Sequence, residues 1–165
     1  ELATEDAEAL PAIEAAAAQR FLDLPELSGL DFSATRKPDD LRRLIRRGHC
    51  LVAYMDNAIV GFLASEPFGR ELHIWEMDVH PAHQRHGIGA GLVRACQIDA
   101  RNSSFRALTL TTFRHVPWNG PFYARLGFEE VVALDAHPRL ASELAVEADH
   151  GLPMDQRCAM IHFLD

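Results

Sequence analysis

The sequence lacks several features that define whole classes of protein. No apolar run approaches the ~20 residues of a membrane-spanning helix, and the first residues show no signal-peptide pattern. Cysteine is scarce, with three residues in 165 and no Cys-x-x-Cys pair. A chain of this length buries enough surface to fold without disulfides or a metal. We therefore expect three buried thiols in a protein of the reducing cytoplasm, with no membrane partner.

Positive charge is also in deficit. Lys and Arg number 16 against 24 Asp and Glu, so the net charge is −8. A surface of this sign repels the phosphate backbone, so we do not expect nucleic acid as a partner. It mildly favours a cationic substrate. The hydrophobic content of 48% is typical of a globular protein.

Hydrophobic periodicity predicts alternating helices and strands. The expected elements are a helix within residues 1–22, a loop over 23–37, a helix over 38–47, a hairpin of strands 49–55 and 58–65, a strand over 71–79, a helix from residue 88 to the 102–104 turn, a strand over 107–113, a short helix over 119–126, a strand over 128–134, a helix over 138–149 and a strand over 157–164. We find no repeat and no linker. The fold expected is one α/β domain over residues 1–165, with a mixed, mostly antiparallel central sheet flanked by helices.

Some predictions concern single positions. Asp56-Asn57 is expected to form the tight turn of the hairpin, and Asn119 to cap the short helix. Ile13, Ala17 and Phe21 are expected to face the core. The same holds for the face of the central helix formed by residues 88, 92, 95 and 96.

The stretch from Leu72 to Leu92 has the most specific pattern in the chain. An apolar strand breaks at Pro81 and passes through Gln84-Arg85-His86-Gly87-Ile88-Gly89 into a helix. The first N–H groups of a helix lack intrahelical partners and carry partial positive charge, so such a turn binds phosphate. The dinucleotide fingerprint Gly-x-Gly-x-x-Gly fails because position 92 is Leu, and no Gly-Lys-Ser/Thr of a P-loop follows.

What remains is the motif Val79-x-Pro81-x-x-Gln84-x-x-Gly87-x-Gly89, followed by Leu92, which resembles the GNAT superfamily of N-acetyltransferases. The block from Trp118 to Phe128 (WNGPFYARLGF) is similar to a second, downstream block of that superfamily. The resemblance covers residues 50–130 best.

The resemblance implies a GNAT-like fold, acetyl-CoA as the co-substrate and an amine as the acceptor. The residues it implies for acetyl-CoA binding are Met77, Asp78, Val79, Gln84, Arg85, His86, Gly87, Ile88, Gly89, Ala90, Asn119, Phe122 and Tyr123. Backbone N–H groups of Met77 and Val79 would contact the pantetheine arm and polarise the thioester carbonyl. In similar enzymes the tyrosine hydroxyl protonates the departing thiolate, a role that falls to Tyr123.

A primary amine attacks a thioester only when it is neutral, so a base is expected. The candidates lie on the strand before the turn, with Glu76 ranked first and His73 second. Strict alternation places His73 with Trp75, Met77 and Val79 on one face and Glu76 with Asp78 on the other, and a bulge would shift this register.

Two alternatives of other classes stay open. One is a non-catalytic acyl-CoA-binding or sensing module on the same fold. The other is a zinc-dependent hydrolase built on His80, His83 and His86, although Pro81 and the lack of a fourth ligand argue against it. Residues 20–37 and 112–118 are expected to border the acceptor, a small-molecule amine or an amine of a peptide or protein. The sequence leaves open which amine it is, the acyl-chain preference and the oligomeric state, for which a homodimer is one expectation.

Overall fold

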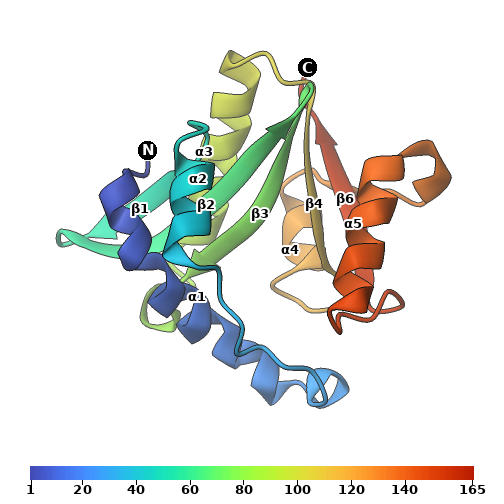
Figure 1. Cartoon of the computed structure of the whole chain (residues 1–165), viewed down its shortest axis with the longest axis horizontal. Coiled ribbons are helices and arrows are strands. Elements are labelled where there is room, and N and C mark those ends of the chain that lie inside the picture. The colour runs from blue at the N-terminus through green and yellow to red at the C-terminus, as the bar shows by residue number, and fades with distance from the viewer. The chain divides into compact units, whose positions relative to one another are not determined.

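The computed structural model describes all 165 residues, and its elements follow the predicted order (Figure 1). Six strands form one sheet in the order β1-β2-β3-β4-β6-β5. β3 and β4 are parallel, whereas β1 with β2, β4 with β6 and β5 with β6 are antiparallel. The prediction of a mixed, mostly antiparallel sheet flanked by helices is confirmed.

The chain divides into two compact units, residues 1–67 with 74–99 and residues 68–73 with 100–165. The division falls within β3 (Glu71–Val79). The ladder between β3 and β4 comprises Glu71↔Ala107, Leu72↔Leu108 and His73↔Thr109.

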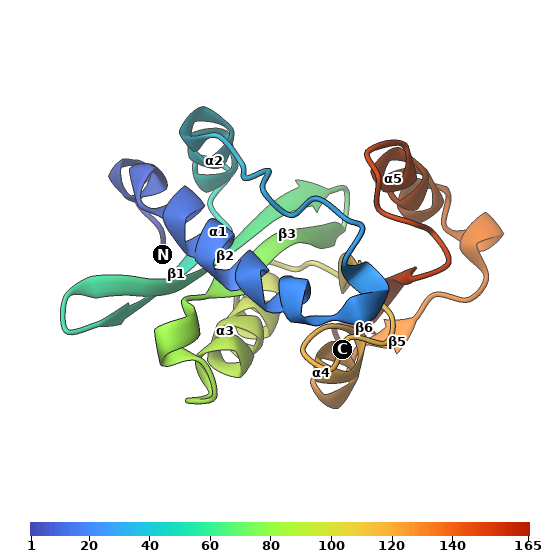
Figure 2. The ribbon, with the colours of Figure 1, turned by 90° about the horizontal axis from the view of Figure 1, so that it is seen from below.

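The first unit has helices on both faces of its strands (Figure 2). α1 (Leu10–Ala18) and α2 (Pro38–Ile45) cover one face of β1 (Leu51–Met55) and β2 (Ala58–Phe68), and α3 (Ile88–Asn102) covers the opposite face. Short 3₁₀ turns span Thr4–Glu8, Gln19–Asp23, Pro25–Leu27 and Pro81–His83. The core beneath α1 and α2 is formed by Leu2, Ala7, Leu10, Ile13, Leu41, Leu44, Ile45, Cys50, Phe62 and Ala64.

The second unit is built on β4 (Ala107–Phe113) and β6 (Arg157–Phe163), which pair along seven residues. β5 (Glu129–Glu130) pairs with the other edge of β6. α4 (Gly120–Arg125) and α5 (Pro138–Asp149) lie on opposite faces of these strands (Figure 2). A 3₁₀ turn spans Leu134–Ala136. Leu140, Leu144 and Ala159 form a small core under α5, with Val131 and Leu134 packed against it.

Local chemistry explains why the main elements were predictable. Asp56 and Asn57 have φ of 50° and 64°, as a two-residue hairpin turn of this type requires. Gly48 follows α2 with φ of 88°, the left-handed conformation that ends a helix without the steric cost of a side chain. All three cysteines are buried free thiols, as predicted.

Four detailed predictions are wrong. Ala95 is exposed, and the buried positions of α3 are instead Leu92, Val93, Cys96 and Ala100. The strand expected over 128–134 is limited to β5, because the chain leaves the sheet after Val131 N–H donates to Ala159, and Val132 is 85% exposed. Phe21 is only half-buried, stacked on Phe32 at 4.8 Å between ring centroids. The fourth, Asn119, is described below. No helix of the structure is long and apolar enough to cross a membrane.

Candidate active site

The predicted phosphate-binding turn is held by the side chain at its start. Gln84 Nε2 donates to the carbonyl of Val79 at 2.9 Å, which ties the turn to the end of β3. Arg85 and Gly87 both take left-handed backbone angles, with φ of 66° and 76°. Gly91 N–H then donates to Gly87 at 2.9 Å, and α3 begins. A 15-residue helix therefore starts directly after a turn that is exposed from Arg85 to Gly87, and its first N–H groups lack intrahelical partners.

The histidines before and within this turn have local roles. His80 Nδ1 accepts the N–H of Ala82 at 3.1 Å and so caps the 3₁₀ turn Pro81–His83. The rings of His80 and His83 pack edge to face at 6.1 Å between centroids. No group of three or more His, Cys, Asp and Glu side chains has a geometry that could hold a metal ion.

Glu76 lies in a cluster of three carboxylates and one guanidinium within the first unit. Glu76 and Asp78 come from β3, Glu14 from α1, and Arg36 from the segment that precedes α2. Glu14 Oε2 accepts the backbone N–H of Arg36 at 3.0 Å. Arg36 Nε lies 3.5 Å from Glu76 Oε1, and the guanidinium lies over the Trp75 ring at 5.3 Å from its centroid. We call these four residues the carboxylate cluster.

The carboxylate cluster has shifted protonation equilibria. Burial, and then the charge of Glu76, raise the pKa of Glu14 to about 7. Burial and the same neighbour raise the pKa of Asp78 well above its usual range. Arg36 acts against both shifts but does not offset them. Near neutral pH both the protonated and the ionised form of Glu14 are therefore present.

Two neighbouring side chains near the centre of β3 contact the same arginine. Trp75 packs against the core beneath α1 and α2, and its indole N–H donates to Glu66 at 2.9 Å. The next residue, Glu76, also meets Arg36. The guanidinium of Arg36 therefore lies against both the aromatic ring of Trp75 and the carboxylate of Glu76.

His73 belongs to a different set of contacts, within the second unit. The side chain is fully buried, and its Nδ1 lies 2.9 Å from Thr109 Oγ1 and 3.2 Å from Arg139 Nη1. Arg139 also donates to Glu71 at 2.7 Å, and His137 Nε2 lies 2.9 Å from the same carboxylate. Arginine only donates, so His73 Nδ1 is an acceptor towards it and that nitrogen is engaged. We call Glu71, His73, Thr109, His137 and Arg139 the arginine network.

The downstream motif shows a different geometry from the one predicted for Asn119. Asn119 precedes α4, but its Oδ1 accepts from Thr112 Oγ1 at 2.8 Å and from Phe113 N–H at 3.4 Å instead of capping the helix. The prediction of a side-chain cap is wrong, because the hydroxyl and N–H at the end of β4 supply nearer donors. Tyr123 is buried, with its ring between Phe122 and Phe128 at 5.1 and 5.6 Å.

Gly120 explains why this motif needs a glycine. A Cβ at that position would stand 2.5 Å from the carbonyl oxygen of Arg114, so no side chain fits there. The Arg114 side chain itself binds Glu130 at 2.9 Å and the carbonyl of Asp155 at 2.9 Å. Arg114 therefore fixes the start of the 112–118 loop.

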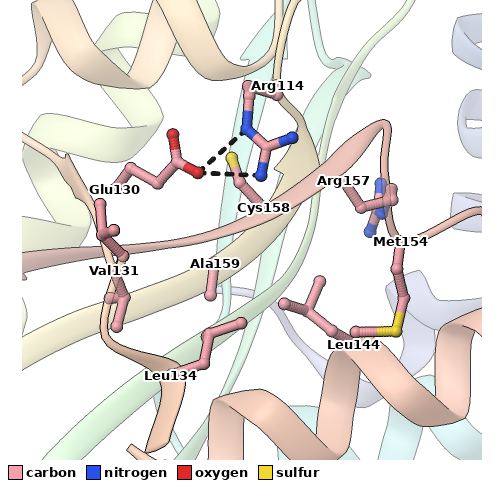
Figure 3. Close-up of a pocket in the computed structure, with 10 residues that line it drawn as sticks. Arg114, Glu130, Val131, Leu134, Leu144, Met154, Arg157, Cys158 and Ala159 are labelled. Carbon is pink, nitrogen blue, oxygen red and sulfur yellow. Dashed lines mark hydrogen bonds and ion pairs between the residues drawn. The ribbon is translucent and has the colours of Figure 1, made fainter. Parts of the chain in front are cut away.

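A cavity of about 190 Å³ opens beside these residues in the second unit (Figure 3). Its walls are Arg114, Glu130, Val131, Val132, Leu134, Leu144, Met154, Arg157, Cys158 and Ala159. The two arginines that line it are each paired with a carboxylate, Arg114 with Glu130 and Arg157 with Glu147. The cavity was not predicted from the sequence.

Sequence reasoning missed Glu14 and Arg36. Glu14 is the only charged residue of α1 and looks like a solvated position of an alanine-rich helix. Arg36 lies in a stretch expected to border the acceptor, but nothing in its neighbours distinguishes it from Lys37. No local pattern marks these two residues. They lie far from β3 in the sequence, and only the folded chain brings them next to its side chains.

Solved structures show which class of protein has this fold. The PaiA N-acetyltransferase of Thermoplasma acidophilum, solved with coenzyme A, is similar with a TM-score of 0.71 and 14% identity, over 98% of this chain and 95% of that one. Ard1 of Thermoplasma volcanium gives 0.70 and 18% over 100% and 95%. The ribosomal-protein-S18-alanine N-acetyltransferase of Escherichia coli gives 0.67 and 16% over 99% and 91%. At these identities the similarity establishes the fold, which is that of the N-acetyltransferases.

The sequence itself gives the family. Residues 46–130, just over half of the chain, match the family described as an acetyltransferase (GNAT) domain. The chain belongs to this family, so the resemblance carried by the two motifs is confirmed.

Proposed function

We propose that residues 1–165 form a single N-acetyltransferase domain that transfers the acetyl group of acetyl-CoA to an amine by direct attack in a ternary complex. The observation that carries the proposal is the turn after β3, where left-handed Arg85 and Gly87 lead into the first N–H groups of α3. Fixed backbone donors at the positive end of a long helix suit a pyrophosphate.

The acetyl-CoA contacts proposed follow from the family motif. The turn from Gln84 to Ala90 would hold the pyrophosphate, and the backbone of β3 from Met77 to Val79 the pantetheine arm and the thioester carbonyl. Met77 to Val79 lie beyond His73, the last residue of β3 that pairs with β4. Fixed N–H dipoles at a developing oxyanion are typically worth about 3–4 kcal/mol of transition-state stabilisation. Asn119 and Phe122 would support the same arm from the second motif.

Glu76 is the base we propose. Its side chain is 26% exposed and ion-paired with Arg36, so it is accessible to an acceptor. His73 remains the second candidate, but its burial and its engaged Nδ1 favour a role in holding β3, β4 and α5 together.

Tyr123 is the acid we propose for the departing thiolate. Tyr123 is a buried phenol in an aromatic environment, and its hydroxyl can donate a proton to a nearby anion. A covalent acyl-enzyme is not proposed, because burial raises the pKa of Cys96 to about 12 and of Cys158 to about 11. Thiols of that basicity are protonated and unreactive near neutral pH.

Calorimetry and thiol release test the proposal together. Gly89→Asp places a negative side chain in the turn and should abolish acetyl-CoA binding, whereas Ala95→Asp adds the same charge at an exposed position of α3 and should not. Binding that survives Gly89→Asp contradicts the turn assignment. Tyr123→Phe should lower kcat of thiol release at least a hundredfold and leave the Kd for coenzyme A within twofold. A chain that binds acetyl-CoA but never releases thiol with any amine is the non-catalytic sensing module instead.

A further inference from the structure

The carboxylate cluster contains more acidic groups than its own arginine could balance if all of them were ionised. Glu14, Glu76 and Asp78 together face one guanidinium, that of Arg36. Both Glu14 and Asp78 are partly withdrawn from water, which makes their ionised forms costly. A buried surplus of this kind is stabilised when a cation enters from outside.

Arg36 shows that the cluster accepts a cation. Its guanidinium lies over the Trp75 ring and beside Glu76, a combination of an aromatic face and a carboxylate that favours organic cations. The polar set is also incomplete, because the Oδ2 atom of Asp78 is buried without a donor from a basic or amide group, and its carboxyl meets only the carboxyl of Glu76. Buried carboxylate oxygens are normally paired, so an acceptor of this kind within a group of acids calls for a donor from a ligand.

We propose that the carboxylate cluster binds the acceptor, and that the acceptor is an aliphatic amine with a second positive charge. Arg36 balances one of the three carboxylates and the reacting ammonium balances another. The third is left for a further cationic group on the same molecule. Glu14 then determines specificity for the charged acceptor. Diamines and similar cations are the substrate class of the proposed N-acetyltransferase, and the inference rests on that proposed function.

The proton balance fits these groups. The acceptor arrives as an ammonium ion and gives one proton to a carboxylate of the cluster. The neutral nitrogen attacks the thioester carbon, the N–C bond forms and the C–S bond breaks. The second nitrogen proton leaves after attack and replaces the proton that Tyr123 gives to the thiolate. The products are the amide, the free thiol and one proton, which the cluster returns to water.

The pKa of Glu14 is consistent with an acceptor that first binds as an ammonium ion and then gives a proton to the cluster. Glu14 has a pKa of about 7, so near neutral pH it is divided between the form that binds an ammonium and the form that has accepted a proton. The charged groups that face it are Glu76 and Arg36, together with Asp78. Asp78 is faced by the same two residues and by Glu14.

A matched series of amines tests the charge requirement. The molecules 1,4-diaminobutane, butylamine and 4-aminobutanoate all have a primary amine at the end of a four-carbon chain. Their total charges are about +2, +1 and 0 at neutral pH, given ordinary amine and carboxyl pKa values, and rates are compared per amine group. In thiol-release assays we expect kcat/KM to fall at least tenfold at each step. In Glu14→Gln, the fall in kcat/KM from 1,4-diaminobutane to butylamine should be less than threefold. Asp40→Asn, an equal change of charge at an exposed position of α2, should leave this fall as in the wild type. Equal kcat/KM for the three amines overturns the proposal.

A binding experiment separates this inference from the proposed catalysis. Calorimetry of 1,4-diaminobutane in two buffers of different ionisation enthalpy should show proton release on binding, because a bound cation lowers the pKa of the carboxyls it meets. Both Glu14→Gln and Asp78→Asn should weaken binding at least tenfold and reduce the proton release, while in Glu14→Gln, which lies outside the proposed acetyl-CoA site, Kd for coenzyme A stays within twofold. Diamine binding without thiol release would keep the cation site and refute the acetyl transfer. Unaltered diamine binding in both variants, with circular dichroism confirming that they are folded, overturns the site.

Discussion

Two charged groups on the same strand have opposite electrostatic balance. At the start of β3, Glu71 meets both Arg139 and His137, and these partners lower its pKa despite its burial. Near the end of β3, Glu76 and Asp78 share one arginine with Glu14, and the pKa values of Asp78 and Glu14 are raised.

The difference separates structural from functional roles. In the arginine network every charge has a partner, and the hydrogen bonds join β3, β4 and α5. A saturated network of this kind fixes the geometry of a fold. The carboxylate cluster is short of positive charge, which costs stability and is typical of sites that bind or transfer protons. A shifted pKa alone does not assign a function to a carboxyl group. The raised pKa values of Glu14 and Asp78, together with the shortage of positive charge around them, favour a functional role.

The largest effect is expected from Glu76→Gln. The amide keeps the size of the side chain but accepts no proton, so kcat/KM should fall by about 10²–10⁴, the usual contribution of a general base. The fall should exceed that for Glu76→Asp, which retains a carboxylate. Steady-state kinetics from pH 6 to 9 measures it. A loss of less than threefold would move the base to another residue.

Arg139→Met should have the next largest effect, on stability. It removes the donors to Glu71 and Thr109 and the contact of the guanidinium with Phe68 at 4.6 Å. Hydrogen bonds to charged groups contribute about 1.5–3 kcal/mol each, so we expect a loss of about 2–3 kcal/mol in urea unfolding. Because the pKa of Glu71 is lowered in the folded state, this contribution is present above its ordinary value of 4.5 and is lost as the pH falls below it. A loss that does not shrink towards pH 3 would show that Glu71 is not the partner that matters.

Glu14→Gln should raise the free energy of unfolding at high pH, whereas Arg139→Met lowers it. A carboxyl with a pKa raised to about 7 stabilises the fold least when it is ionised, so its penalty appears as the pH rises from 4.5 through about 7. We expect the variant to be more stable than the wild type by about 1–2 kcal/mol at pH 8.5 and equal to it near pH 4, after allowing for partial exposure. Thermal unfolding at both pH values gives the difference. Greater stability of the wild type at pH 8.5 would contradict the charge imbalance.

The smallest effect is expected from His73→Gln. Glutamine can still accept from Thr109 and Arg139, so unfolding should change by about 1 kcal/mol, the value of one ordinary hydrogen bond. The pH dependence of kcat/KM should keep its wild-type shape, since His73 supplies no proton step in our proposal. Disappearance of the limb near neutrality would restore His73 as the base.

Much of the fold could be read from local chemistry. Asp56-Asn57, Pro38 and Gly48 each mark a turn or a helix end by their own backbone preferences, and the motif around Gly87 marks the strand–turn–helix. These signals are local, so they need no tertiary information. Predictions failed where a neighbour distant in the sequence competes: Thr112 draws the Asn119 side chain away from a cap, and the chain after Val131 leaves the sheet.

The sequence by itself therefore determined the family, the order of elements and the turn proposed for phosphate. Each rests on residues close together along the chain, whose spacing and backbone preference are legible in one dimension. Only the tertiary structure decided the electrostatics of β3. It brought Glu14 and Arg36 to Glu76 and Asp78, and Arg139 to Glu71 and His73, and it placed Trp75 and Glu76 beside one guanidinium. Charge balance depends on distance and burial, and neither quantity is present in the sequence until the chain has folded.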